Sequence, residues 1–133
     1  MLVGLARLHD ELSARAPHEL VGTPSVHASL IEGGTELSTY PDHCVLKVER
    51  RTLPGETVAL VEEELRAVAD GATVTTFFAR DPLETRRDAA IVELLVARAA
   101  AILGAEPELV GVPFWTDAAL VASDAPGVVR RFR

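Results

Sequence analysis

The chain has 133 residues, a length that suits one domain, or one small domain followed by a fragment. Its net charge of -7 and its 5% aromatic content argue against binding to nucleic acids or anionic membranes. The single cysteine cannot form an internal disulfide, and no signal peptide or run long enough to span a bilayer is visible. We therefore expect a cytoplasmic protein with no nucleic-acid or membrane partner.

A helix is predicted from Leu2 to about Ala16, because leucines recur there at helical spacing and Pro17 follows. The leucines of this stripe are Leu2, Leu5, Leu8 and Leu12. Two strands are predicted next, over 25–31 and 44–51, because apolar and polar residues alternate in both. The inward positions predicted by that alternation are Val26, Ala28 and Leu30 in the first strand, and Cys44, Leu46 and Val48 in the second. We expect Cys44 to be a buried structural thiol.

Turn residues at Leu53-Pro54-Gly55 precede a second predicted helix, over 56–70, which Gly71 ends. Its apolar stripe consists of Val58, Val61, Leu65 and Val68. Residues 72–79 are rich in β-branched and aromatic side chains and predict a third strand.

Asp81-Pro82 marks a predicted domain boundary, which divides the chain into 1–80 and 81–133. Beyond it we predict a helix over 85–103 that ends at Gly104. A strand over 109–114, a short helix over 116–122 and a strand-like stretch from Gly127 to Phe132 complete the predicted elements.

The order α-β-β-α-β is that of a split β-α-β unit without its first strand, so we predict an α+β, ferredoxin-like fold. It consists of an antiparallel sheet with two helices on one face, and an α/β fragment follows it. The absent strand belongs in the middle of the sheet, where its absence leaves two unpaired edges. The sheet then shrinks, or another segment such as 127–132 fills the gap, or a second copy of the chain pairs with an edge. On this basis we expect self-association, as a homodimer or a higher oligomer, through a strand edge.

The segment from Gly33-Gly34 through Pro41 to Glu49-Arg50-Arg51-Thr52-Leu53-Pro54-Gly55 resembles the lid, or dimerisation, domain of the di-zinc aminoacylase and carboxypeptidase family. That family includes acetylornithine deacetylase, succinyl-diaminopimelate desuccinylase and glutamate carboxypeptidase. The stretch 113–119 is similar to a turn that lines the family's active site. The resemblance implies a hydrolase that cleaves N-acyl or peptide bonds beside a free carboxylate.

The same resemblance suggests four substrate-binding residues. Arg51 falls on the position of the arginine that contacts the substrate carboxylate, a bidentate task that suits guanidinium. Ser38 stands where the family has an asparagine that points at the substrate. Thr116 and Asp117 lie in the active-site turn, although both are also natural helix-capping residues.

No catalytic residue and no metal ligand is assigned to this chain. The family's two zinc ions are held by histidine and carboxylate ligands, and we find no such spacing here. Surface or hydrogen-bonded histidines are expected at His9, His18, His27 and His43. We therefore interpret the chain as a piece of a zinc-dependent metallohydrolase, truncated at both ends and inactive alone. Two alternatives are a stand-alone ferredoxin-like dimerisation or regulatory module, and a protein that completes an enzyme in trans.

Overall fold

The first helix lies where the leucine spacing places it. A computed structural model describes residues 1–124, and in it α1 spans Leu2–Ser13. Leu5, Leu8 and Leu12 are buried on one stripe, and Leu12 is 0% exposed, whereas Leu2 in the first turn is exposed. The predicted helix is confirmed, with a slightly earlier end.

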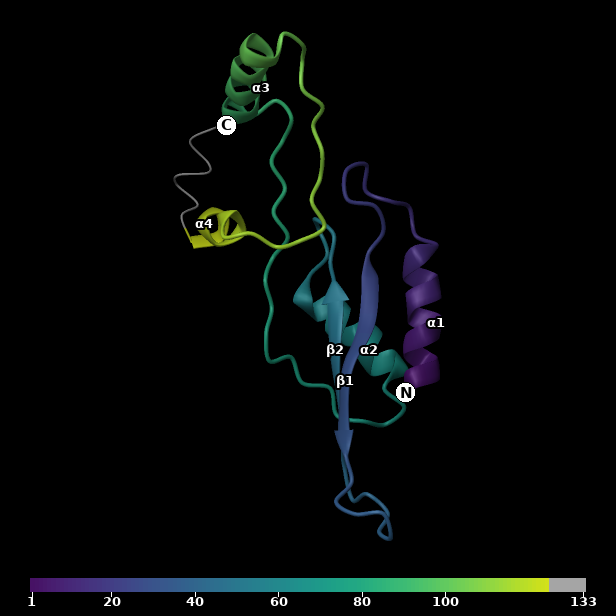
Figure 1. Ribbon diagram of the computed structural model, residues 1–133. Coiled ribbons are helices and arrows are strands. Elements are labelled where there is room, and N and C mark those ends of the chain that lie inside the picture. The colour runs from purple at the N-terminus through teal and green to yellow at the C-terminus, as the bar shows by residue number, and fades with distance from the viewer. Residues whose placement is uncertain (125–133) are drawn as a thin grey trace.

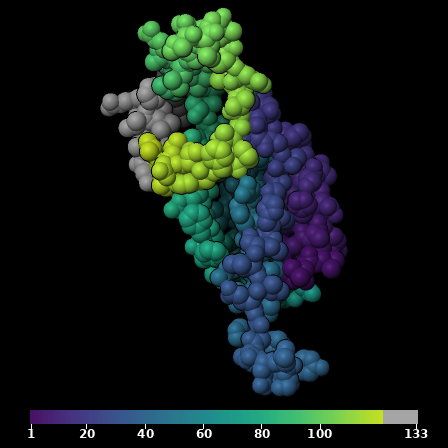
Figure 2. All heavy atoms as spheres, viewed as in Figure 1, coloured from purple at the N-terminus to yellow at the C-terminus, as the bar shows by residue number. Residues whose placement is uncertain are grey.

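The two predicted strands pair as an antiparallel hairpin. β1 spans Ser25–Gly33 and β2 spans Cys44–Arg51, with Ser25 opposite Arg51 at one end and Gly33 opposite Cys44 at the other. The connection 34–43 projects from that second end, beyond the helices (Figures 1 and 2). Among the described residues this hairpin is the whole sheet.

A bulge in β1 changes which of its side chains share a face. The register shifts between Ala28, which lies opposite Val48, and Leu30, which lies opposite Lys47. Since opposed residues point to the same side of a sheet, Ile31 rather than Leu30 lies on the helix-covered side, opposite Leu46. The predicted inward position of Leu30 is therefore wrong, because one extra residue inverts the alternation.

The buried part of the sheet lies at the end nearest the helices. Val26 is buried against α1, whereas Leu30 and Ile31 are exposed further along β1. Cys44 is exposed, so its predicted burial is wrong. It begins β2 beside the projecting loop, where the strands extend past the helices.

The second helix, α2 (Val58–Val68), lies on the same side of the sheet as α1 (Figure 1). Its N-cap is Thr57, whose hydroxyl oxygen accepts a hydrogen bond from the Leu60 backbone N–H. The two helices approach closely at Gly4, where an added Cβ would stand 2.9 Å from the Val68 carbonyl oxygen. The core consists of Leu5, Leu8, Leu12 and Val26, with Leu46, Val48, Leu65 and Val68 packed against it.

The third predicted strand is absent from the described residues. Residues 72–79 form no ladder, and the sheet ends at β2. The segment runs upward alongside β2 in Figure 1. As a consequence no residue of α2 is fully buried, and its predicted stripe is only half-covered, because the sheet over it is incomplete. The α+β architecture, an antiparallel sheet with α1 and α2 on one side, is as predicted.

The remaining elements are helical. α3 spans Ala90–Leu103 and ends as predicted at Gly104, whose left-handed backbone (φ 75°) closes the last turn. Its predicted start at Thr85 is wrong, because Arg86 and Asp88 pair in a turn before it. α4 spans Ala118–Asp124, close to the helix predicted over 116–122. The strand predicted over 109–114 does not form, and the stretch 127–132 lies outside the described residues.

Candidate functional site

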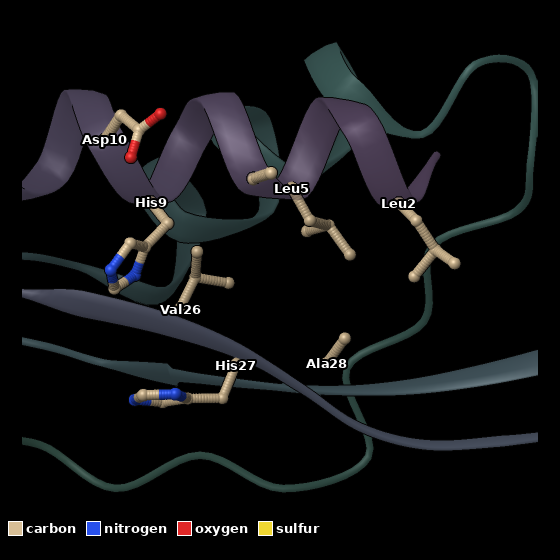
Figure 3. Close-up of a pocket in the computed structure, with 8 residues that line it drawn as sticks. Leu2, Leu5, His9, Asp10, Val26, His27 and Ala28 are labelled. Carbon is tan, nitrogen blue, oxygen red and sulfur yellow. The ribbon is translucent and has the colours of Figure 1, made fainter.

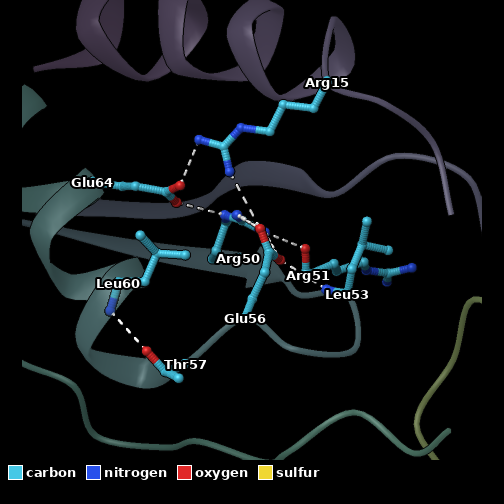
Figure 4. A network of polar contacts seen from close by, with 8 residues as sticks. All are labelled: Arg15, Arg50, Arg51, Leu53, Glu56, Thr57, Leu60 and Glu64. Carbon is cyan, nitrogen blue, oxygen red and sulfur yellow. Dashed lines mark hydrogen bonds and ion pairs between the residues drawn. The ribbon is translucent and has the colours of Figure 1, made fainter.

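A buried arginine lies at the end of β2. Arg50 follows Leu46 and Val48 on the helix-covered side of the strand, and its side chain is only 2% exposed. Its guanidinium donates to both carboxylate oxygens of Glu56, at 2.7 and 3.1 Å, and to Glu64 Oε2 at 3.1 Å. Arg15 reaches the same two carboxylates from beyond the end of α1, at 3.3 Å to Glu56 and 2.6 Å to Glu64 (Figure 4). The four side chains therefore join β2, α2 and the segment after α1.

The turn between β2 and α2 is held by the same cluster. Glu56 Oε2 also accepts a hydrogen bond from the Leu53 backbone N–H at 2.8 Å. Desolvation by burial opposes ionisation of Glu56, but the hydrogen bonds from Arg50 and Leu53 outweigh it, so the pKa of Glu56 is lowered. Desolvation likewise opposes the charge of Arg50, and its bonds to Glu56 and Glu64 raise its pKa on balance. Arg50 and Glu56 are thus both charged at neutral pH.

Arg50 was not among the residues singled out from the sequence. The signal was present, because a charged residue occupies the next inward position of an alternating strand after Leu46 and Val48. A buried charge needs a partner, and glutamates follow within one helix. The family resemblance pointed instead to the neighbouring Arg51 as the functional arginine.

Arg51 lies on the opposite side of β2 from the buried cluster. Its side chain is 53% exposed, and Nε donates to Glu49 Oε1 at 3.0 Å. Nη1 donates to the Pro113 carbonyl oxygen at 3.3 Å, which brings the stretch before α4 to the end of the strand. Arg51 thus combines an accessible guanidinium with a fixed position.

A groove of about 1170 Å³ lies beside β2. Arg51 and Thr116 both line it. Ser38 lies in the projecting connection, at the other end of the hairpin from Arg51. Asp117 is exposed and does not line the groove. The structure therefore brings together two of the four predicted substrate-binding residues.

Thr116 and Asp117 also mark the start of α4. The Thr116 carbonyl oxygen accepts from the Ala119 N–H at 3.0 Å, and that of Asp117 accepts from Val121 at 3.1 Å. Trp115, just before them, lies 5.8 Å from the Arg80 guanidinium, which also stacks over Phe78 at 4.6 Å. This stack connects the segment after α2 to the segment before α4.

A smaller hollow of about 380 Å³ lies between α1 and β1. His9 of α1 and His27 of β1 line it, and their ring centroids lie 6.3 Å apart (Figure 3). Ser25 Oγ lies 3.1 Å from His27 Nε2 on the exposed side of the strand. Within residues 1–124 no three His, Cys, Asp or Glu side chains are gathered so that they could hold a metal ion. The described residues therefore do not fit the di-zinc centre that the resemblance implies for the intact family.

Comparison with protein families gives one finding about the chain. Residues 2–89 match the family described as peptidase dimerisation domain, of the M20 type. The match covers α1, both strands, α2 and the extended segment that follows. Comparison with the curated proteins gives no match. None of the helices described has the length and apolarity needed to cross a bilayer.

Proposed function

The chain belongs to the peptidase dimerisation domain family of the M20 peptidases, and on that premise we propose that it serves as the lid and dimerisation part of a metallohydrolase. The parent reaction is hydrolysis of a peptide or N-acyl bond beside a free carboxylate, as in the deacetylases, desuccinylases and carboxypeptidases that the sequence resembles. The chain alone is inactive. Its one cysteine supports a reducing, cytoplasmic location.

Arg51 is the observation that carries the substrate assignment. Its guanidinium is accessible and lines the groove with Thr116, whereas the guanidinium of the neighbouring Arg50 is hydrogen-bonded to two glutamates. A carboxylate placed there can accept two parallel N–H bonds from Arg51, in competition with the exposed Glu49. This supports Arg51 as the contact for the substrate carboxylate.

The assignment is tested by titrating N-acetyl amino acids into the chain and following binding by NMR. We expect weak, saturable binding that Arg51→Met weakens at least about tenfold. Arg66→Met, which changes an exposed arginine on α2, serves as the matched control and leaves binding unchanged. Equal binding by both variants would contradict the role of Arg51. Zinc-dependent release of acetate by the chain alone would contradict its inactivity.

Self-association is proposed through the outer edge of β1. Within residues 1–124, β1 pairs with β2 on one side and has no strand on its other side, where Leu30 and Ile31 expose apolar surface beside the edge. The open edge of β2 faces the groove instead, where the chain's own segments surround it. An exposed strand edge is a template for pairing with another chain.

The outer-edge interface is tested by sedimentation equilibrium of the full chain. Leu30→Lys combined with Ile31→Lys places charge beside the edge, and we expect dimer dissociation to become at least about tenfold easier. Ile102→Lys is the control, because it replaces an exposed apolar residue on α3, away from β1. A wild-type chain that is monomeric at high concentration, or a double variant that dimerises as well as the control, would argue against this interface.

A further inference from the structure

Two histidines meet at the outer edge of β1. Val26 is buried against α1, so His27 beside it points to the side of the sheet that the helices leave uncovered. His9 comes from α1, on the covered side. Since β2 occupies one edge of β1, the two rings approach each other around the other edge, which has no strand within residues 1–124. Figure 3 shows one ring on each side of the β1 ribbon.

The spacing of the two rings suits one shared metal ion. Their centroids lie 6.3 Å apart, and the ring planes are tilted by 56°. Two imidazoles bound to the same Zn²⁺ have centroids roughly 5–6.5 Å apart, because each Zn–N bond is about 2.0–2.1 Å long. Both side chains are exposed, so rotation about their side-chain bonds can bring one nitrogen of each ring onto the ion. No movement of α1 relative to β1 is needed.

Each ring has a nitrogen that can bind a metal. Among residues 1–124, neither ring nitrogen of His9 has a hydrogen-bond partner. His27 Nε2 lies 3.1 Å from Ser25 Oγ. When Nε2–H donates to that hydroxyl oxygen, the lone pair of Nδ1 is free and the ring is held in one orientation. Each histidine therefore offers a neutral imidazole nitrogen as a ligand.

The surroundings of the pair favour a cation with a preference for nitrogen ligands. Asp10 lines the same hollow of about 380 Å³, and no lysine or arginine of residues 1–124 does. The rest of the lining is apolar and consists of Leu2, Leu5, Ala6, Val26 and Ala28. Imidazole nitrogen suits Zn²⁺, Cu²⁺ and Ni²⁺, whereas Mg²⁺ and Ca²⁺ prefer oxygen ligands. The chemistry of the pair thus points to a transition metal.

We propose that His9 and His27 together bind one divalent transition-metal ion of the zinc class at the outer edge of β1. No third His, Cys, Asp or Glu of the described chain is gathered with them, so water completes the coordination. The ion connects α1 to β1 and keeps positions open to a further ligand. This site goes beyond the lid and dimerisation function and does not depend on it, because Leu30 and Ile31 lie further along β1.

The site is tested by isothermal titration of ZnCl₂ into the full chain. We expect saturable binding of one ion per chain, and no saturable binding of MgCl₂. His9→Gln and His27→Gln should each weaken zinc binding at least about tenfold, because a single imidazole cannot chelate the ion. His43→Gln is the matched control. It removes an exposed histidine beside Asp42 at the other end of the hairpin, and should bind zinc like the wild type.

NMR of the histidine side chains gives an independent readout. Zinc should shift the imidazole signals of His9 and His27, and should leave those of His18 and His43 in place. Both glutamine variants replace exposed side chains, and far-ultraviolet circular dichroism should match that of the wild type. Lost binding with an unchanged spectrum then reports the missing ligand and not a loss of fold.

Leu30→Lys combined with Ile31→Lys separates this site from the proposed dimer. We expect the double variant to be monomeric and still to bind one zinc ion per chain with wild-type affinity. Loss of zinc binding in it, or one ion per two wild-type chains, would show that a second copy completes the site and would overturn the single-chain assignment. A monomeric wild-type chain that binds zinc would refute the dimer and leave this site standing.

Three further outcomes would overturn the proposal. The first is an absence of saturable zinc binding by the wild-type chain. The second is wild-type affinity in His9→Gln or in His27→Gln. The third is loss of binding in His43→Gln, which would place the ion beside Asp42 at the start of β2 instead.

Discussion

Replacing the buried Arg50 should lower the free energy of unfolding far more than replacing the exposed Arg51 beside it at the end of β2. In Arg50→Met the apolar stem is kept, but the carboxylates of Glu56 and Glu64 lose their main partner while only 13% and 10% exposed. Breaking a buried ion pair on one side costs about 3–5 kcal/mol. Arg15 still contacts both glutamates, and Leu53 N–H still donates to Glu56. We therefore expect the lower end, about 3 kcal/mol.

The measurement is urea unfolding at pH 7 followed by far-ultraviolet circular dichroism. With a slope of about 1–2 kcal/mol per molar urea, the midpoint should fall by roughly 2 M. Arg51→Met is the matched control, since it removes the neighbouring but exposed guanidinium and should cost no more than about 0.5 kcal/mol. Glu56→Gln with Glu64→Gln, added to Arg50→Met, should recover at least half of the loss, because no buried charge is then unpaired.

Two results would refute this reasoning. If Arg50→Met and Arg51→Met unfold at the same urea concentration, the Arg50 cluster does not hold β2 to α2. If the added glutamine substitutions restore nothing, the loss comes from packing of the arginine stem and not from unpaired carboxylates.

Three further predictions concern pH, helix packing and capping. Because the folded-state pKa of Glu56 is lowered from 4.5, the stabilisation from its charged form is present above that pH and is lost as the pH falls through the lowered value. The urea midpoint should therefore fall less between pH 7 and pH 3 in Glu56→Gln than in the wild type. An equal fall in both proteins would contradict this. Gly4→Ala should destabilise the chain by about 1 kcal/mol, because overpacking against Val68 costs more than the gain in helix propensity. A higher urea midpoint than that of the wild type would show that α1 and α2 can move apart without cost. Thr57→Ala should cost about 1 kcal/mol through loss of the α2 cap, whereas Thr57→Ser should be nearly neutral in the same assay, and equal losses would exclude the cap.

The regular elements were predictable where a local pattern and a local stop agree. The leucine spacing before Pro17 predicted α1, Gly104 predicted the end of α3, and alternation predicted β1 and β2. The errors in β1 have a physical cause, since a bulge is decided by pairing with β2 and not by the sequence of one strand. The predicted burial of Cys44 was wrong for a similar reason. Alternation along a strand assigns each residue to a face of the sheet, but it does not show whether a helix covers that face.

The candidate site was only partly predictable. Arg51 was found by resemblance and Thr116 by a turn motif, and the structure places both on one groove. Their neighbour Arg50 became evident only once Glu56 and Glu64 were seen to converge on it from the turn and from α2. Convergence of residues from different elements is a tertiary property, which spacing along the chain does not contain.

By itself the sequence determined the family, the helix and hairpin order and the expectation of an incomplete sheet, because periodicity, turn residues and element order are local properties of the chain. The tertiary structure alone decided how far the sheet extends. Within residues 1–124 the sheet stops at β2, and residues 74–79 run beside it outside any ladder, with a groove between them. A strand needs a partner at hydrogen-bonding distance, and β-branched residues cannot make residues 72–79 a strand where no neighbour is present.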